Sequence, residues 1–493
     1  MQSLRVPGDV ASLADALAAG PDEIVIDGTV EATDLVIDRP VHIRAAAEGA
    51  TLRGAGTRVA RLRGDVRLTD LRIVNDQGHG LRIEAGAPHL SGCTIQVRQT
   101  ALGVHGTSRP VLRSVQVERC GTGLLVTDTA APDVDTLVIV ASGGGMVFRD
   151  DAMGGIRQCA IVSGSFAAVE VRGQAAPVFE GLAIPAAGTG ALFIHEDAAP
   201  RFIELLVQRS GIASVELTGR SRATLRQVRL EHAGGSGLFI HGHAAPVISA
   251  VEIVHSALAG VEVAEAARPT VEQLTVEQAG GSGLFLRGTA GGTWRGVRLQ
   301  KLAAAGVEAA EQADPTVDGL TIQDPQGSGL FIHDRAAGTW LDVQVRGATL
   351  ASVEASGAAH PELERVALFG GADAAIRVLD DATAEVLEAR ISHHLRAAAD
   401  VGGRGRLHLE DSRVQDSRGG GLRVAGQGQA TLVGVDMADC GGDAAVVTDE
   451  GRLRWERGGA DAPVKAVDGA VVSLVGVSLP RATATGGATL TQA

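Results

Sequence analysis

The sequence has no tyrosine, and only nine phenylalanines and three tryptophans occur among 493 residues, so its core must be built from smaller side chains. Its four cysteines lack the close spacing of metal-ligand motifs. No apolar run reaches the length of a membrane span, and no basic-then-apolar leader precedes the first expected strand. These absences argue against a zinc domain and a membrane protein. Free thiols without a leader predict a cytoplasmic protein.

A basic surface is also missing. The chain has 44 Lys and Arg residues against 58 Asp and Glu residues, which gives a formal net charge of −14. Nucleic-acid and anionic membrane surfaces both require clustered cations. We therefore expect neither a nucleic acid nor a membrane as a partner of this acidic protein.

The chain does contain a strict repeat. Between Val169 and Leu368, bulky apolar residues recur every 23 positions, and two further apolar rows follow three and five residues later. The first row consists of Phe179, Phe202, Leu225, Ile248, Val271, Trp294, Val317, Trp340 and Leu363. Such a repeat is typical of a solenoid, in which each turn, here called a coil, buries its apolar residues against neighbouring coils. The two tryptophans, Trp294 and Trp340, belong to this row and are predicted to lie in the core.

The repeat divides the chain into three parts. Residues 1–55 are expected to form an N-terminal cap and the first strands, with a short amphipathic capping helix between Val10 and Ala19. Residues 56–480 are expected to form about 18 coils of about 23 residues. Residues 481–493 are rich in Thr, Ala and Gly and are expected to be a flexible end.

The opening segments resemble a known superfamily. The segments Asp22–Gly28 and Leu35–Arg44, followed by short coils punctuated by glycine, resemble the right-handed parallel β-helices of pectate-lyase-like proteins. The chain is most similar to their short-coil, carbohydrate-binding-and-hydrolysis-type repeats. The resemblance implies an all-β, right-handed parallel β-helix, and that superfamily includes lyases, hydrolases, epimerases and binding modules. A leucine-rich repeat fits less well, because Ala279 stands where that repeat expects Asn or Cys.

A second pattern with a period of 46 residues lies on the strands. Alternate residues of a strand face opposite sides, so a residue between two core residues faces outward. One outward row then alternates between Glu and Phe, and we call it the Glu/Phe stripe: Glu170, Phe193, Glu216, Phe239, Glu262, Phe285, Glu308, Phe331 and Glu354. The stripe has two interpretations. It separates like charges along the stack, or it is a contact surface for a protein partner or a second copy of the chain.

A row two residues further along is expected to lie beside the stripe. It includes His195, His241, Arg287 and His333. At two coils apart, roughly 9.6 Å, these histidines are too far from one another to share a tetrahedral metal. They are interpreted as part of the repeat, and their protonation would make a contact on this face pH-sensitive.

The repeat favours a non-enzymatic function. An active site should interrupt a repeat locally, and the strictest coils show no interruption. Alginate epimerases use a tyrosine, which this chain lacks, and Gly78-His79-Gly80 matches a polygalacturonase motif without its paired aspartates. We therefore predict an interaction scaffold that uses the stripe, with no catalytic residue, cofactor or metal and with a homodimer possible. The alternative is a carbohydrate-binding or polysaccharide-degrading protein, with Glu216 and Glu262 as the conceivable carboxylate pair.

Overall fold

The computed structural model describes residues 2–493, which contain 49 strands and one helix. In chain order the first elements are β1 (Ser3–Val6), α1 (Leu13–Ala19), β2 (Glu23–Ile26), β3 (Thr29–Glu31), β4 (Leu35–Ile37), β5 (Val41–Ala45), β6 (Thr51–Arg53), β7 (Arg58–Leu62), β8 (Val66–Thr69), β9 (Arg72–Asn75), β10 (His79–Ile83), β11 (His89–Ser91), β12 (Thr94–Val97), β13 (Thr100–Val104), β14 (Val111–Val126), β15 (Asp133–Phe148), β16 (Gly155–Arg157), β17 (Ala160–Ser163), β18 (Val169–Val171), β19 (Val178–Ala187), β20 (Leu192–Ile194), β21 (Arg201–Val207), β22 (Val215–Leu217), β23 (Thr224–Ala233) and β24 (Leu238–Ile240). They are followed by β25 (Val247–Ser256), β26 (Val261–Val263), β27 (Thr270–Glu277), β28 (Leu284–Leu286), β29 (Thr293–Gln300), β30 (Val307–Ala309), β31 (Thr316–Gln323), β32 (Leu330–Ile332), β33 (Thr339–Arg346), β34 (Val353–Ala355), β35 (Glu362–Phe369), β36 (Ile376–Val378), β37 (Thr383–Leu387), β38 (Arg390–Ser392), β39 (Ala399–Val401), β40 (Arg406–Glu410), β41 (Arg413–Gln415), β42 (Leu422–Val424), β43 (Gln429–Ala438), β44 (Ala445–Val447), β45 (Arg452–Ala460), β46 (Val464–Ala466), β47 (Val471–Ser478), β48 (Ala482–Ala484) and β49 (Thr489–Gln492).

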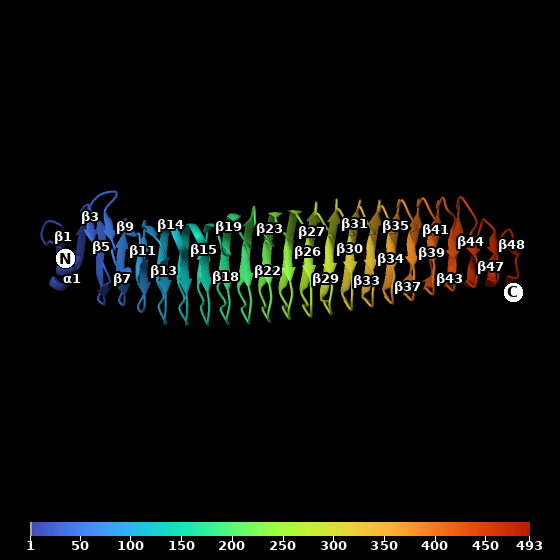
Figure 1. The fold of residues 1–493 in the computed structure, drawn as a ribbon, viewed down its shortest axis with the longest axis horizontal. Helices are drawn as coiled ribbons and strands as arrows, with labels where there is room; N and C mark the ends of the chain where they lie inside the picture. The colour runs from blue at the N-terminus through green and yellow to red at the C-terminus, as the bar shows by residue number, and fades with distance from the viewer. Residues whose placement is uncertain (1) are drawn as a thin grey trace. The chain divides into compact units, whose positions relative to one another are not determined.

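The chain divides into two units. The first comprises Met1–Phe239 with Ala244–Val251, and the second comprises Ile240–His243 with Glu252–Ala493. In each unit, strands of one coil pair in parallel with the equivalent strands of the next, and Figure 1 shows the coils following one another. Within residues 2–493, no helix has the length and hydropathy that crossing a membrane requires.

The predicted capping helix is present as α1. Ser12 is its N-cap, and the Ser12 hydroxyl accepts a hydrogen bond from the Asp15 amide at 3.1 Å. Leu13 and Ala16 are buried, and Figure 1 shows α1 beside the first strands of the chain. The helix therefore supplies apolar cover at the start of the solenoid, where a bare strand edge would promote association.

The coils of the second unit show why the period is 23 residues. Strands β29, β31, β33 and β35 pair in register, so that Trp294 aligns with Val317, Val317 with Trp340, and Trp340 with Leu363. All four residues are buried. Because equivalent residues stack directly, each coil must present an apolar side chain at the same position, and the predicted core row is confirmed.

The structure has about 21 coils where the sequence indicated about 18, at the expected length of about 23 residues. The difference arises partly at the N-terminus, since β2 already pairs with β5 and β5 with β8. At the other end, residues 481–493, expected to be a flexible end, contain β48 and β49, which pair with β46 and β47. The backbone ladder continues there although the segment offers few large apolar side chains.

Many acidic residues have a structural role at one bend of the coil. Glu196 and Glu311 adopt left-handed backbone conformations there. Their carboxylates accept hydrogen bonds from the amides of Gly173 and Gly288 in the preceding coil, at 2.8 and 3.1 Å. A Cβ at Gly173 would lie 2.7 Å from the Asp150 amide nitrogen, so the close approach requires glycine. Part of the negative charge is therefore used to satisfy backbone donors between coils.

Candidate functional site

The structure places the Glu/Phe stripe along neighbouring short strands. In the first unit, Glu170 of β18 aligns with Phe193 of β20, and Phe193 aligns with Glu216 of β22; Phe239 lies on β24. In the second unit the aligned row runs through β26, β28, β30, β32 and β34 and consists of Glu262, Phe285, Glu308, Phe331 and Glu354. Each of these residues is partly buried between two buried neighbours on its strand. The row is therefore on the outer face of the strands, but its side chains are not fully exposed.

The acidic members of the stripe are bound by side chains from the following coil. His195 Nε2 lies 3.2 Å from Glu170 Oε1, Arg287 Nη2 lies 3.0 Å from Glu262 Oε1, and His333 Nε2 lies 3.6 Å from Glu308 Oε1. The hydrogen bond from His195 is the main cause that lowers the pKa of Glu170. In each case the partner is 25 residues further along the chain, one coil plus two residues.

The aromatic members pack on the same histidines. The ring of Phe193 stacks on His195 with centroids 4.4 Å apart, and Phe331 stacks on His333 at 4.4 Å. His241 lies 4.0 Å from Glu265, where its Nδ1 faces a carboxylate oxygen. The 46-residue period thus has a local explanation. The glutamate of one coil pairs with a histidine or arginine of the next coil, and that partner stands two residues after the phenylalanine of the stripe. Much of the stripe's binding capacity is used internally.

A second exposed row, which the sequence reasoning missed, lies four residues before the glutamates of the stripe. In the first unit it contains Phe166 and Ile212, whose side chains are 67% and 50% exposed. In the second unit it contains Leu258 and Leu350, which are 57% and 46% exposed. The 46-residue spacing of these apolar residues was a signal in the sequence, but they fall in turns, where alternation on a strand gives no guidance.

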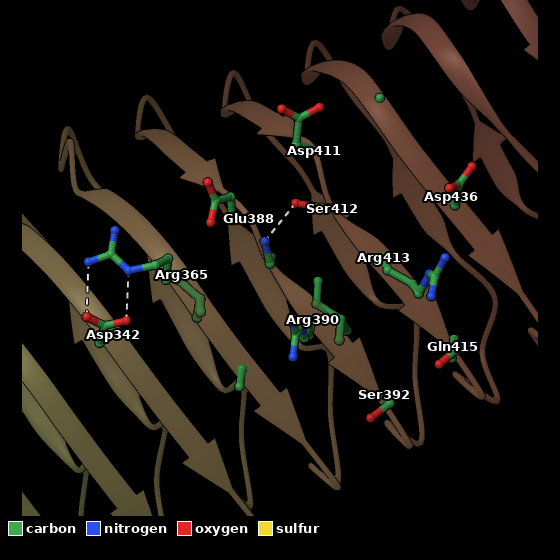
Figure 2. A pocket seen from close by; sticks show the side chains of 15 residues that line it. Asp342, Arg365, Glu388, Arg390, Ser392, Asp411, Ser412, Arg413, Gln415 and Asp436 are labelled. Atoms are coloured by element: carbon green, nitrogen blue, oxygen red, sulfur yellow. Dashed lines mark hydrogen bonds and ion pairs between the residues drawn. The ribbon is translucent and has the colours of Figure 1, made fainter.

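The second unit also contains a long polar groove with a volume of about 990 Å³ (Figure 2). Its charged lining side chains come from consecutive coils and are Asp342, Arg365, Glu388, Arg390, Asp411, Arg413 and Asp436. Ser392, Ser412 and Gln415 add hydroxyl and amide groups. Seen from close by, these side chains project from neighbouring strands along one surface (Figure 2). The groove therefore offers hydrogen-bond donors and acceptors in rows that follow the coils.

The groove coincides with an interruption of the repeat. The long strand β35 pairs with two shorter strands, β37 and β38, and the following coil is likewise divided into β40 and β41. At the division, the amide of Ala389 donates to the Ser412 hydroxyl at 2.9 Å, and that hydroxyl donates to the Glu410 carbonyl at 2.7 Å. A serine side chain thus replaces a backbone bridge between coils at this point.

The interruption also changes one row of side chains. The bend at which the strand divides contains Glu388 in one coil and Asp411 in the next, and the residue at this position adopts a left-handed conformation in each coil. In the second unit the row begins with Gln273, Gly296 and Gly319 and continues with Asp342, Arg365, Glu388, Asp411 and Gly434. Residues other than Gly, Asn and Asp also occupy this bend in earlier coils, as Glu204, Gln227 and Ala250 do, so the change at the groove is one of charge. Four consecutive charged residues at a strained bend are the kind of departure from a repeat that marks a functional site.

The charges of the groove differ in their partners. Arg365 binds Asp342 through two hydrogen bonds, of 2.8 and 3.0 Å, which are the main cause that lowers the pKa of Asp342. Within residues 2–493, the side chains of Glu388, Asp411 and Asp436 form no ion pair or hydrogen bond. Three exposed carboxylates in this groove therefore remain available to a ligand.

The arginines on the strands that follow the bend, Arg390 and Arg413, are available to a ligand as well. Arg390 aligns with Arg413, and Arg413 aligns with Asp436 in the next coil. In the part of the chain that the structure describes, neither guanidinium forms an ion pair. The groove is thus bordered by acceptors at the bend and donors on the adjoining strands. The described residues contain no group of three or more His, Cys, Asp or Glu that would hold a metal ion.

One family description agrees with the geometry of the coils. The family description "Right handed beta helix region" matches residues 210–365. No curated protein matches the chain. Among solved structures, the catalytic domain of a GH87 α-1,3-glucanase in complex with nigerose is similar, with 9% identity and a TM-score of 0.40. The match covers 66% of this chain and 65% of that one.

Two further structures are similar at lower scores. The PL6-family alginate lyase AlyGC has 10% identity and a TM-score of 0.26, with coverage of 100% of this chain and 99% of that chain. The catalytic unit of a GH87 α-1,3-glucanase from Streptomyces thermodiastaticus has 13% identity and a TM-score of 0.26, with coverage of 87% and 66%. This protein is a right-handed parallel β-helix, as its resemblance predicted.

Proposed function

We propose that this protein binds a neutral polysaccharide chain along the groove that Glu388, Arg413 and their neighbours line. The observation that carries the proposal is the row of unpaired carboxylates and guanidinium groups at the interruption of the repeat. Sugar hydroxyls both donate and accept hydrogen bonds, so they suit a surface that presents carboxylate acceptors beside guanidinium donors.

The charge balance of the groove favours a neutral ligand. Its lining contains four carboxylates, three guanidinium groups and the polar side chains of two serines and a glutamine. A polyanion would meet repulsion from the acceptors at the bend, and a polycation would meet repulsion from the arginines. The proposal concerns binding alone and includes no bond-breaking step.

A paired substitution in the groove tests the proposal. The double variant Asp411→Asn, Arg413→Gln removes one acceptor charge and one donor charge while leaving the net charge unchanged. Asn also tolerates the left-handed conformation of residue 411 (φ 45°), so the bend should persist. We expect wild-type protein to bind neutral glycans on a glycan array, and the double variant to bind them about 10- to 100-fold more weakly in calorimetry, because charge-assisted hydrogen bonds are lost.

The control uses the same chemistry outside the groove. Asp197 and Arg220 form an exposed ion pair in the first unit, with hydrogen bonds of 2.7 Å. The variant Asp197→Asn, Arg220→Gln should bind glycans like the wild type. Equal binding by the two double variants, or no neutral glycan bound by the wild type, would refute the proposal.

A second candidate function is self-association through the exposed apolar row that contains Phe166 and Ile212. These exposed apolar side chains recur at a constant spacing, so in a two-fold contact they would pack against the same row of a second copy of the chain. If this contact forms, Phe166→Ser with Ile212→Ser should lower the sedimentation coefficient at high protein concentration. The control is Val138→Ser with Val140→Ser, which removes exposed apolar groups elsewhere in the unit. A concentration-independent coefficient for the wild type would exclude this candidate.

A further inference from the structure

A small pocket in the first unit breaks the pattern of the Glu/Phe stripe. The row that reads Glu170, Phe193 and Glu216 on β18, β20 and β22 is occupied in earlier coils by other residues. Strand pairing places Arg82 of β10 next to Gly103 of β13, and Gly103 next to Leu125 of β14. The alternation of Glu and Phe is therefore absent in these coils, and a residue without a side chain lies in the middle of the row.

Gly103 creates the space. A Cβ at this position would lie 2.8 Å from Nε2 of His105, so the imidazole lies over the glycine. The resulting pocket has a volume of about 240 Å³. This volume suits a small chemical group and excludes a polymer chain.

The lining of this pocket is basic in an otherwise acidic protein. Its polar side chains are those of Arg58, His79, Arg82, Thr100, His105 and Arg149, and neither Asp nor Glu belongs to the lining. The remaining lining residues are Leu81, Gly103 and Leu125. A concave site with one sign of charge and low-dielectric walls concentrates the electrostatic field and attracts a counter-ion.

The nearby carboxylates leave part of this charge unsatisfied. Asp34 lies 3.4 Å from Arg58 Nε, and Asp150 lies 3.7 Å from Arg149 Nε. Both of these Nε atoms are nevertheless buried without a hydrogen-bond partner. Glu84 contacts Arg82 Nε at 3.0 Å from outside the pocket lining. The Nε atoms of Arg58 and Arg149 face carboxylates of the chain and are closed to a ligand. Within residues 2–493, the Nη groups of Arg58, Arg82 and Arg149 form no hydrogen bond, so they are the donors left for an acceptor in the pocket.

The two histidines complete the site. His105 Nδ1 lies 2.9 Å from the Thr127 hydroxyl, and the Thr100 amide donates to His79 Nδ1 at 3.3 Å. Nδ1 of His79 is therefore an acceptor, so in a neutral ring the proton is on Nε2. Burial is the first cause that lowers the pKa of both imidazoles, and nearby arginines lower it further. The rings are thus held in place by neighbouring coils beside the guanidinium groups.

We propose that the pocket around Gly103 binds an oxyanion group, that is, a carboxylate, sulfate or phosphate, with Arg58, Arg82 and Arg149 as its cationic partners. This site lies in the first unit and shares no residue with the polar groove of the second unit. Planar guanidinium groups bind oxyanions through paired, charge-assisted hydrogen bonds, which explains why arginine recurs around one hollow.

Calorimetric titration of the full-length protein tests the site. The probes are sodium sulfate, sodium phosphate and a sodium uronate at constant ionic strength, with glucose as the uncharged probe. We expect at least one anion to bind in the millimolar range or tighter and glucose not to bind here. Arg82→Gln and Arg149→Gln should each weaken that binding about tenfold or more, since each removes a charge-assisted hydrogen bond. Preference for the uronate identifies a sugar acid as the source, and preference for sulfate or phosphate identifies an inorganic anion or its ester.

Two further variants separate the site from a general charge effect. Arg109→Gln removes an exposed arginine that is not part of the lining, and it should leave anion binding unchanged. Gly103→Glu places a carboxylate in the hollow, as in the later coils of the row, and should abolish anion binding. The proposal is overturned if no anion binds the wild type, or if Arg109→Gln weakens binding as much as Arg82→Gln does.

Discussion

Replacing Trp340 by alanine is expected to lower the free energy of unfolding by about 3–5 kcal/mol. Trp340 is fully buried, and it aligns with Val317 on one side and Leu363 on the other within the apolar row of the second unit. Each coil of a solenoid buries its apolar residues mainly against its neighbours, so a cavity at one coil weakens two interfaces. Urea denaturation followed by circular dichroism measures the loss.

Phenylalanine variants provide the matched control for this prediction. Trp340 Nε1 has no hydrogen-bond partner, whereas Trp294 Nε1 donates to the Gly291 carbonyl at 3.3 Å. Trp340→Phe therefore loses only volume and relieves an unsatisfied donor, while Trp294→Phe also loses a hydrogen bond. Trp340→Phe should be the milder of the two by about 1 kcal/mol. A loss below about 1 kcal/mol for Trp340→Ala would contradict the stacked core.

Acidification from pH 7 to pH 4 is expected to remove up to about 3 kcal/mol of stability through His394. The side chain of His394 is fully buried, and its Nε2 lies 3.1 Å from the Ser352 hydroxyl. Burial is the first cause that lowers its pKa from 6.5 to about 4, and the neighbouring His393 lowers it further. The contribution is present above pH 6.5. It is lost as the pH falls toward 4, because over that range the unfolded chain binds a proton that the folded chain excludes.

His394→Gln distinguishes this effect from the general loss of stability in acid. The substitution removes the titrating group, so the free energy of unfolding should fall less steeply between pH 6.5 and pH 4. His360→Gln alters an exposed histidine and should keep the wild-type slope. Equal slopes for His394→Gln and the wild type would show that His394 does not carry the effect.

Much of the fold was predictable because stacking imposes direct sequence constraints. The core row that contains Phe202 and Trp340 recurs at 23 residues, since register places each member on the next. The same logic predicted the outer row that contains Glu170 and Phe193. It did not predict their mutual pairing with His195, because contacts between one coil and the next depend on side-chain conformation as well as on register.

The polar groove was not predictable in this way. The strictest coils of the repeat end near Leu368, whereas the groove depends on the coils of Glu388 and Asp411. A signal was present, because the bend row changes from Gly319 to charged residues at Asp342. That signal has meaning only once the bend is known to be left-handed and the strand beyond it is known to divide.

The basic pocket shows the same limit. Arg58, Arg82 and Arg149 are far apart in sequence, and the net charge of −14 argued against the clustered cations that a nucleic acid or an anionic membrane would require. Net charge describes the whole surface and does not describe one hollow. Strand pairing across five coils brings the three side chains to one pocket, and the space itself depends on the missing side chain of Gly103.

Hydrogen–deuterium exchange with a bound glycan tests the central claim most directly. The ligand is an oligosaccharide of the neutral glycan that binds best on the array. We predict slower exchange in peptides that cover residues 386–392 and 409–415, with unchanged exchange at 193–195 and 331–333 of the Glu/Phe stripe. Protection of the stripe without protection of the groove would contradict the claim, and the interaction surface would then be the stripe.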